Sequence, residues 1–430
     1  MKQSYYNLYA ESAKGMVCYN TITENIGLMP LKVFNCLSED DFSSINPDII
    51  ENLKELKFIL PNEVNEFEEL TNEYQDSLNE KIFYLTLLPS LDCNVRCWYC
   101  FEKLKPGSRL GKDTPIAILN YVKNIFQNSD IEYLRIELFG GEPLLYFEEE
   151  VFPLLKDIEH YVRSISKKIS IFIVTNALCI ENHMFPLFKS INAKFQISID
   201  GYRDRHNKVK RLSNKKIETY QKVIETIINL TEYYDTYINL RINFDDETLI
   251  KLPEIITDLN KVNRKKIVIH LERIWQTRAS KGLNKDLSNV ILSFQANGFK
   301  ISYMNFFRRS HSCKVSKPNQ AVINYNKMVY KCIGRDFTDD RQEGVLNMNG
   351  EVSWNKDVLN KRLSICTYNN NLCKQCKFLP LCWGPCCQKQ LEDPINILKY
   401  CQLEYMEIPI DEYVMLKFND ALIRRELHDS

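Results

Sequence analysis

The sequence has no excess charge of either sign, because 56 Lys and Arg side chains balance 56 Asp and Glu side chains. A partner recruited mainly by bulk electrostatics, such as duplex DNA or an anionic membrane, is therefore not expected. Glycine (13) and proline (15) are too few for a collagen-like or low-complexity chain. Since 44% of the 430 residues are hydrophobic and 26% are charged, we expect a folded soluble protein of two or three domains.

Long apolar runs are also lacking. No stretch approaches the roughly 20 apolar residues that a membrane-spanning helix needs. The first residues, from Met1 to Tyr6, show no basic segment followed by an apolar one. We therefore expect no membrane anchor, no signal peptide and a cytoplasmic location. Because that compartment is reducing, clustered cysteines are expected to be metal ligands or redox groups rather than disulfides.

Cysteine is the residue type that is unusually placed. Six of the 15 cysteines occur before residue 180, and the other nine follow from Cys313 onward. An odd number fits poorly with a network of disulfides. We interpret Cys36 and Cys179 as small buried hydrophobic residues, whereas the clustered cysteines need another explanation.

Residues 1–80 are predicted to form a winged-helix-like domain of a hairpin and helices. Its expected elements are strands around Tyr6–Tyr9 and Met16–Tyr19, helices that open at Pro30 and Pro47, an extended piece at Lys57–Leu60 and an acidic helix from Asn65.

Residues 81–300 alternate apolar runs of strand length with segments of helical periodicity. The predicted strands are Phe83–Leu88, Leu134–Phe139, Ser170–Val174, Lys194–Ile199, Tyr237–Asn243 and Lys266–Arg273. Six such units indicate an α/β fold, a partial (β/α)6 TIM-type barrel, in which the chemistry lies in the loops after the strands. Residues 301–430 are cysteine-rich with little regular structure apart from a hairpin at 347–352, so we expect this third domain to depend on metal.

The loop after the first barrel strand contains Cys93-x3-Cys97-x2-Cys100. Three thiolates this close can bind three irons of a cubane cluster and leave the fourth iron open. A zinc site completed by a distant residue is the alternative. With Tyr99 before the last cysteine, the motif resembles that of the radical S-adenosylmethionine (SAM) enzymes. The resemblance implies a 4Fe–4S cluster that chelates SAM and cleaves it reductively, and the resulting 5′-deoxyadenosyl radical then takes a hydrogen atom from the substrate.

Loops after the next strands resemble the same family. One contains Gly-Gly-Glu-Pro at 140–143, another Ser-Ile-Asp-Gly at 198–201, and the fifth strand ends in Arg-Ile-Asn. Paired glycines allow a close backbone approach, which we assign to the ligand, and Glu142 is expected to accept a hydrogen bond from the SAM ammonium group. Thr175-Asn176-Ala177 departs from the commoner Thr-Asn-Gly. The SAM-binding residues implied by the resemblance are Tyr99, Gly140, Gly141, Glu142, Pro143, Asn176, Ser198, Asp200 and Arg211, although Arg211 also fits a solvated lysine-rich face.

The C-terminal cysteines follow the spacing Cys-x2-Cys-x5-Cys-x3-Cys from Cys373 to Cys386. This resembles the SPASM extension of radical SAM enzymes and implies two auxiliary 4Fe–4S clusters, three clusters in all. One would be bound by Cys373, Cys376, Cys382 and Cys401, and the other by Cys313, Cys332 and Cys386. Two zinc sites are the alternative.

Three features depart from the SPASM pattern. The gap from Cys313 to Cys332 is longer than usual, with Lys327 where the pattern has glycine, and the gap after Cys386 is shorter. No cysteine occurs just before Cys313. The second auxiliary cluster therefore either keeps an open iron or is closed by His311, Cys366 or Cys387.

Radical SAM enzymes with this extension mostly modify peptides or proteins. The N-terminal domain resembles the leader-recognition domain of peptide maturases, which would bind an extended leader by strand addition. Ile333 follows Cys332 where sulfatase maturases have an aspartate. We therefore predict an oxidoreductase that takes hydrogen from a ribosomally made precursor peptide and installs a thioether or carbon–carbon crosslink. Its electrons would come from an external donor such as flavodoxin or ferredoxin. A formylglycine-generating sulfatase maturase and a non-catalytic, cluster-bearing scaffold or regulator are the alternatives.

Overall fold

The computed structural model describes residues 1–212, 218–277, 285–303 and 313–429, which fall into two compact units. Unit 1 consists of Met1–Asn79, Ala279–Cys313 and Ile365–Ser430, and unit 2 consists of Glu80–Arg278 and Lys314–Ser364. The division into consecutive domains 1–80, 81–300 and 301–430 stays a prediction. In the structure, the first and last parts of the chain share one unit.

Unit 2 contains the predicted α/β fold. Its six parallel strands are β6 (Ile82–Leu88), β7 (Tyr133–Leu138), β8 (Lys168–Thr175), β9 (Ala193–Asp200), β10 (Ile238–Phe244) and β11 (Ile267–Arg273), each paired with the next. Helices cover parallel strands on their faces, so the strands consist of nearly continuous apolar runs. Isoleucines at 173, 197, 242 and 269 are all fully buried. The six strands predicted from the sequence are confirmed to within two residues.

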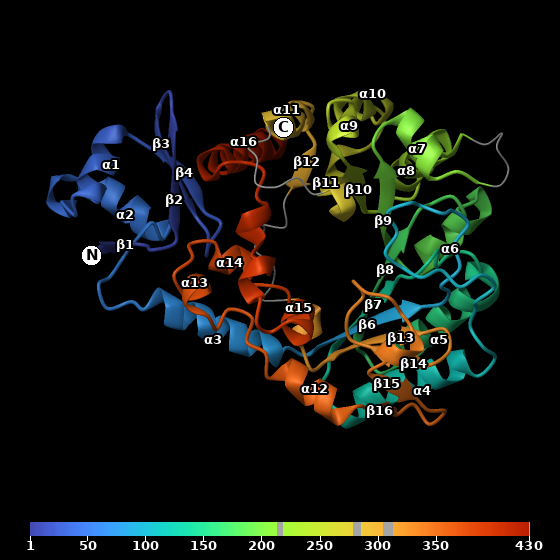
Figure 1. The fold of residues 1–430 in the computed structure, drawn as a ribbon. Coiled ribbons are helices and arrows are strands. Elements are labelled where there is room, and N and C mark those ends of the chain that lie inside the picture. Colours follow the sequence, from blue (N-terminus) through green and yellow to red (C-terminus); the bar gives the residue numbers. More distant parts are fainter. Residues whose placement is uncertain (213–217, 278–284, 304–312, 430) are drawn as a thin grey trace. The chain divides into compact units, whose positions relative to one another are not determined.

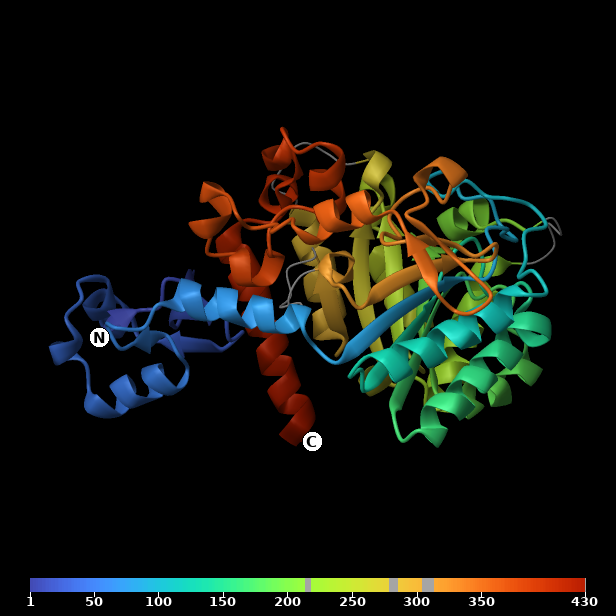
Figure 2. The same ribbon diagram turned by 90° about the horizontal axis from the view of Figure 1, so that it is seen from below.

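Helical segments connect these strands. They are α4 (Thr114–Asn128), η2 (Phe147–Val151), α5 (Phe152–Ser164), η3 (Asn182–Met184), α6 (Phe185–Ser190), α7 (Arg203–Val209), α8 (Thr219–Glu232), α9 (Asp246–Leu249), η4 (Leu252–Glu254), α10 (Ile255–Asp258) and η5 (Arg264–Lys266), and η6 (Trp275–Thr277) follows β11. Prolines lie in the first turns of α4, α5 and α6, where their fixed φ favours the helix and no backbone donor is lost. Figure 2 shows the teal and green helices of this unit gathered along one side of its strands.

Four further strands extend the same sheet beyond β6. They are β13 (Gln320–Asn324), β14 (Met328–Tyr330), β15 (Gly344–Leu346) and β16 (Val352–Trp354), followed by α12 (Lys356–Leu363) and accompanied by η7 (Lys314–Ser316) and η8 (Asp339–Arg341). The hairpin at 347–352 was predicted, but the parallel pairing of β13 with β6 was not. Lys327, which replaces the glycine of the SPASM pattern, lies in the β13–β14 turn with φ +69°.

Unit 1 begins with an antiparallel sheet of β2 (Asn7–Ser12), β3 (Gly15–Asn20) and β4 (Ile26–Met29). One of its faces packs on α1 (Leu31–Ser38) and α2 (Pro47–Glu55), around buried Cys18, Met29 and Phe58. The C-terminal helix α16 (Ile410–Asp429) packs against the same sheet, and the rings of Tyr19 and Tyr413 lie 6.2 Å apart (Figure 1). Strand β4 was not predicted, because we interpreted the segment before it only as a turn.

The remaining elements of unit 1 are β1 (Lys2–Gln3), η1 (Phe42–Ser44), β5 (Ile59–Leu60), α3 (Glu66–Leu78), α11 (Lys285–Ala296), β12 (Lys300–Tyr303), α13 (Asn371–Lys374), α14 (Leu379–Cys382), α15 (Cys387–Glu392), η9 (Ile397–Tyr400) and η10 (Gln402–Tyr405). Side chains from both ends of the chain share a core. Tyr74 of α3 stacks on Trp383, with ring centroids 5.3 Å apart, and Tyr6 and Tyr368 pack beside them. Tyr6, Leu70 and Tyr74 therefore depend on residues 365–430 for their burial, whereas the core around Cys18 and Phe58 is formed within residues 1–79.

Candidate active site

The three cysteines of the first motif lie on the irregular segment between β6 and α4, residues 89–113, which we call the cysteine loop. All three are free thiols. Burial, and then nearby Glu142 and the other two thiols, raise the pKa of Cys93 to about 12. Burial also raises the pKa of Cys97 to about 11 and that of Cys100 above its usual value. Such thiols stay protonated at neutral pH unless a metal displaces the proton.

This donor set fits the cluster that the sequence motif implies. Three thiols close enough to raise one another's pKa lie on one loop, and they are the soft ligands that iron–sulfur clusters use. Within the described ranges, no three Cys, His, Asp or Glu side chains converge as they would around a single metal ion.

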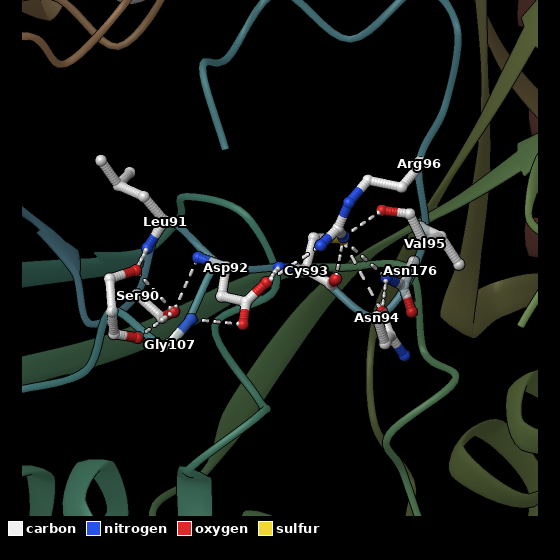
Figure 3. A network of polar contacts seen from close by, with 10 residues as sticks. Ser90, Leu91, Asp92, Cys93, Asn94, Val95, Arg96, Gly107 and Asn176 are labelled. Carbon is white, nitrogen blue, oxygen red and sulfur yellow. Dashed lines mark hydrogen bonds and ion pairs between the residues drawn. The ribbon is translucent and has the colours of Figure 1, made fainter. Parts of the chain in front are cut away.

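The start of the cysteine loop is fixed by its own polar side chains (Figure 3). The carboxylate of Asp92 accepts hydrogen bonds from the amides of Cys93 at 2.7 Å and Gly107 at 2.8 Å, so it joins the two arms of the loop. The hydroxyl of Ser108 accepts from the amide of Leu91 at 2.9 Å. Asp92 therefore orients Cys93, although it is not itself one of the predicted metal ligands.

The glycines after β7 pack against the cysteine loop. The amide of Gly141 donates to the carbonyl of Ser90 at 3.1 Å, and that of Glu142 to the carbonyl of Asp92 at 2.8 Å. A Cβ atom at Gly141 would lie 2.1 Å from the Asp92 oxygen, and one at Gly140 would lie 2.5 Å from the Ser90 oxygen. From the sequence, we assigned this close approach to a ligand. In the structure, the backbone of the cysteine loop lies against the two glycines. A side chain at either position would clash with this backbone, so glycine is required there for packing.

Glu142 connects the ends of β7 and β8. Its carboxylate is fully buried and accepts from the Thr175 hydroxyl at 2.6 Å and from the amides of Asn176 at 2.9 Å and Leu144 at 3.1 Å. Burial raises the pKa of Glu142, although these hydrogen bonds oppose the shift. Pro143 follows directly. That Glu142 also accepts from the SAM ammonium group stays a prediction.

Asn176 lies beside the first cysteine. Its amide nitrogen is 2.7 Å from the side-chain oxygen of Asn94 and 3.7 Å from the sulfur of Cys93. Ala177 has φ +63°, the conformation that the commoner glycine adopts without strain. Cys179 accepts a hydrogen bond from Asn94 at 3.3 Å, so it contacts the cysteine loop.

Tyr99 reaches from the cysteine loop to the ends of β9 and β10. Its hydroxyl donates to Asp200 and accepts from the side-chain amide of Asn243 at 3.1 Å. Asp200 is 1% exposed and lies 3.2 Å from the ammonium group of Lys210. Burial opposes ionisation of Asp200, but Lys210, His206 and the hydrogen bonds outweigh it and lower its pKa. Burial, followed by Asp200, raises the pKa of Tyr99.

Lys210 and His206 are site residues that we did not predict from the sequence. Lys210 is 2% exposed and donates to the carbonyl and the hydroxyl of Ser198 at 2.9 and 2.6 Å, whereas Arg211, which we predicted to reach SAM, is exposed. Burial, followed by Lys210, lowers the pKa of His206 to about 3. The only signal in the sequence was their place after Ser-Ile-Asp-Gly, and the run of basic residues around 208–211 obscured it.

Unit 1 brings together a group of thiols from the C-terminal motif. Burial, followed by Cys373, Cys401 and Cys376, raises the pKa of Cys382 to about 12. These are the four predicted ligands of one auxiliary cluster. Cys366 also interacts with Cys373, so its sulfur belongs to the same group, although we had considered it for the other cluster.

The second predicted set is divided between the units. Cys313 and Cys386 belong to unit 1 and interact electrostatically, whereas Cys332 belongs to unit 2 and accepts from the amide of Gly334 at 3.4 Å. Cys387 is 1% exposed. His311, a candidate fourth ligand, lies outside the described residues.

Comparison with known proteins identifies the region around the cysteine loop. Residues 87–259 match the family model described as the Radical SAM superfamily. The chain carries a radical SAM domain. Over 218 residues it is 27% identical to the radical SAM cyclopropyl synthase TigE of Paramaledivibacter caminithermalis, and over 226 residues it is 26% identical to the GTP 3′,8-cyclase of Campylobacter jejuni subsp. doylei. The matches cover 46% and 51% of this chain, and 44% and 65% of the two relatives.

The solved structure described as native anSMEcpe with bound AdoMet and Cp18Cys peptide resembles this chain in fold. It covers 80% of this chain and 99% of its own, with a TM-score of 0.59 and 18% identity. The fold expected from the sequence, a radical SAM barrel with a cysteine-rich C-terminus, is thereby confirmed. The cyclopropyl synthase and the GTP 3′,8-cyclase are named for different reactions. The radical SAM domain by itself therefore does not indicate the substrate.

Proposed function

We propose that the chain is a radical SAM enzyme that modifies a peptide. The observation that supports the catalytic part is the cysteine loop, which carries three neighbouring thiols and whose first cysteine is held in place by contacts of Asp92, Gly141, Glu142 and Asn176. Cys93, Cys97 and Cys100 would hold a 4Fe–4S cluster. With SAM bound, the cluster supplies one-electron chemistry that removes a hydrogen atom from a substrate.

The cysteines from Cys313 onward support a second role for iron. Cys373, Cys376, Cys382 and Cys401 would hold one auxiliary 4Fe–4S cluster, and Cys313, Cys332 and Cys386 would contribute to another. Zinc would satisfy the same ligands but could not pass electrons. We propose an external donor such as flavodoxin or ferredoxin as the source of electrons, and a cytoplasmic location. Among the described residues, no helix combines the length and apolar character needed to cross a bilayer.

A groove beside β4 supports a peptide as the substrate. It has a volume of about 530 Å³ and lies between β4 and α2. Most of its lining is apolar, namely Ile26, Leu28, Met29, Ile49, Leu53, Leu56 and Phe58. Within the described sheet of unit 1, β4 pairs only with β3, so its other edge offers backbone groups to a further strand. An extended leader segment would pair with this edge and place alternate side chains in the groove.

The register shows which backbone groups face outward. Asn20 donates to the carbonyl of Asn25, and in an antiparallel pair the hydrogen-bonded positions alternate, so Gly27 and Met29 face β3. The amides of Ile26 and Leu28 then point away from β3. Leu28 is also 41% exposed, which leaves its side chain accessible to a partner.

The catalytic proposal is tested by anaerobic reconstitution with iron, sulfide, reductant and SAM. We expect 5′-deoxyadenosine to form and the chain to bind about 12 irons if all three sites are cubanes. Replacement of Cys93, Cys97 and Cys100 by Ala should abolish SAM cleavage. If the wild-type chain forms no 5′-deoxyadenosine, with or without peptide, the proposed enzymatic activity is refuted. A content of about four irons per chain together with zinc would refute the assignment of the auxiliary clusters.

Peptide capture is tested at Leu28. Proline there removes an outward-facing amide while it leaves the pairing with β3 intact, and Leu28→Ala keeps the amide but removes the side chain. With fluorescent peptides made from the short reading frames next to the gene, we expect Leu28→Pro to weaken binding far more than Leu28→Ala. Equal affinities in the two variants would exclude strand addition at β4. Deletion of residues 1–79 is a poor substitute, because it would expose the core that these residues share with residues 365–430.

A further inference from the structure

Tyr99 is bound by side chains from the ends of three strands. Its hydroxyl contacts Asp200 at the end of β9 and Asn243 in β10, and its carbonyl accepts from the side-chain amide of Gln276, after β11, at 2.7 Å. Because Tyr99 lies between Cys97 and Cys100, these contacts act on the segment that carries two of the three predicted cluster ligands. Within this turn, the Cys100 amide also donates to the Cys97 carbonyl at 3.1 Å, and the rings of Trp98 and Tyr99 meet edge-on with centroids 5.6 Å apart.

The partners of Tyr99 are themselves fixed. The carboxylate of Asp200 accepts a hydrogen bond from the side-chain amide of Asn243 at 3.0 Å and forms an ion pair with Lys210 at 3.2 Å. The backbone amide of Asp200 donates to the ring of His206 at 3.3 Å. Lys210 is held by the carbonyl and hydroxyl of Ser198. The polar side chains of Asp200 and Ser198, which the sequence resemblance implied as SAM contacts, therefore interact with protein groups. Asp200 and Lys210 are nearly fully buried, whereas Ser198 is half-buried.

We propose that Asp200, Lys210 and Asn243 are positioning residues that hold Tyr99, and that Tyr99 fixes where Cys97 and Cys100 present their sulfurs to the cluster. Lys210 acts one step away, since it keeps the Asp200 carboxylate charged and directed at the Tyr99 hydroxyl. A buried hydrogen bond to a carboxylate contributes more than a neutral one, which suits a contact that orders an irregular loop. The proposal rests on the cluster assigned above to Cys93, Cys97 and Cys100.

The test compares Tyr99→Phe, Asp200→Asn and the double variant after anaerobic reconstitution. The readouts are the rate at which a chelator bleaches the cluster absorbance and, in cluster-free protein, the hydrogen exchange of amides 93–100. We expect each single variant to lose its cluster about tenfold faster, which corresponds to about 1.4 kcal/mol. The double variant should be no faster than Tyr99→Phe, because Asp200→Asn weakens a contact that is already lost once the Tyr99 hydroxyl is removed.

Tyr220→Phe is the matched control. It removes a hydroxyl that donates to Asp258 at 2.8 Å in the same unit, so it breaks the same kind of bond away from the cysteine loop, and cluster loss should be unchanged. If Asp200→Asn fails to fold, Tyr99→Phe and Lys210→Met still test the proposal, since Tyr99→Phe keeps the ring and removes one hydroxyl.

Three results would overturn the proposal. One is additive effects in the double variant, and another is unchanged cluster loss in Tyr99→Phe. The third is weaker SAM binding by Asp200→Asn, measured by equilibrium dialysis, with unchanged cluster stability, because that would make Asp200 a cofactor contact. A wild-type chain that takes up no iron would instead refute the cluster assignment on which the proposal rests, so the two failures are distinguishable.

Discussion

The amide of Glu142 donates a hydrogen bond to the carbonyl of Asp92 at 2.8 Å, and this contact joins the loop after β7 to the cysteine loop. The same glutamate accepts from Thr175 and Asn176 through its carboxylate. One residue thus joins the ends of β6, β7 and β8. The Gly-Gly-Glu-Pro motif can therefore be understood as part of the support for the predicted cluster ligands, whatever it also contributes to SAM.

Gly141→Ala should displace the cysteine loop, because the new Cβ would lie 2.1 Å from the oxygen of Asp92. We expect a loss of about 2 kcal/mol in the free energy of unfolding, typical of overpacking, and a lower iron content after reconstitution. Gly111→Ala is the control, since its Cβ would meet only the Thr114 hydroxyl at 3.4 Å. Urea unfolding and iron analysis of both variants test this, and equal behaviour would contradict it.

Glu142→Gln should destabilise the chain at pH 8. A side-chain amide nitrogen cannot accept a hydrogen bond, so the buried amide of either Asn176 or Leu144 loses its partner. The expected cost is about 2 kcal/mol, measured by urea unfolding of cluster-free protein. Glu149→Gln, whose side chain is 73% exposed, should change stability little. A cost below that of the control would show that Glu142 is not needed to connect β7 and β8.

Lys327→Gly should stabilise the turn between β13 and β14. At φ +69° a residue with a Cβ costs about 1–2 kcal/mol of strain, which glycine avoids, and this exceeds the roughly 0.5–1 kcal/mol cost of the added freedom of glycine in the unfolded chain. Lys327→Ala keeps the Cβ and should bring no gain. Thermal unfolding of the two variants tests this prediction. A higher melting temperature in Lys327→Ala would show that the lysine side chain, rather than backbone strain, lowers the stability.

His206 should make the chain lose stability in mild acid. Its pKa is about 3 in the folded state and near 6.5 when unfolded, so the unfolded chain binds an extra proton as the pH falls from about 6.5 towards 3. Between pH 7.5 and pH 5 this lowers the free energy of unfolding by about 2 kcal/mol. Asp200, Lys210 and Tyr220 face the ring, and Asp200 stays charged throughout this window because its pKa is lowered.

The check is the difference in stability between pH 7.5 and pH 5 in wild type and in His206→Asn. Asparagine can still accept from the Asp200 amide but does not titrate, so the difference should shrink by about 2 kcal/mol. His183→Asn, at a side chain that is 63% exposed, should leave it unchanged. An unaltered pH dependence in His206→Asn would refute the assignment.

Local spacing carried the predictions that the structure and the comparisons confirm. The six strands were predicted from short apolar runs between helical segments. A strand that is buried on both faces is apolar along its whole length, so it can be recognised without knowing which strands it pairs with. The motif around Cys93, Cys97 and Cys100 predicted the radical SAM domain, because its ligands come from one short loop. Strand β4 and the pairing of β13 with β6 were missed, since four or five residues carry little periodic signal and strand pairing is decided by distant partners.

By itself, the sequence determined that three thiols with the spacing of the radical SAM motif lie on one loop, and this spacing predicts which metal group they would bind. Only the tertiary structure decided which residues support those thiols. Close backbone approaches, as between Gly141 and Asp92, and buried charge pairs, as between Asp200 and Lys210, depend on strand ends that meet in space. The same holds for Cys366 beside Cys373 and for the core shared by residues 1–79 and 365–430, since burial brings together parts of the chain that spacing cannot connect.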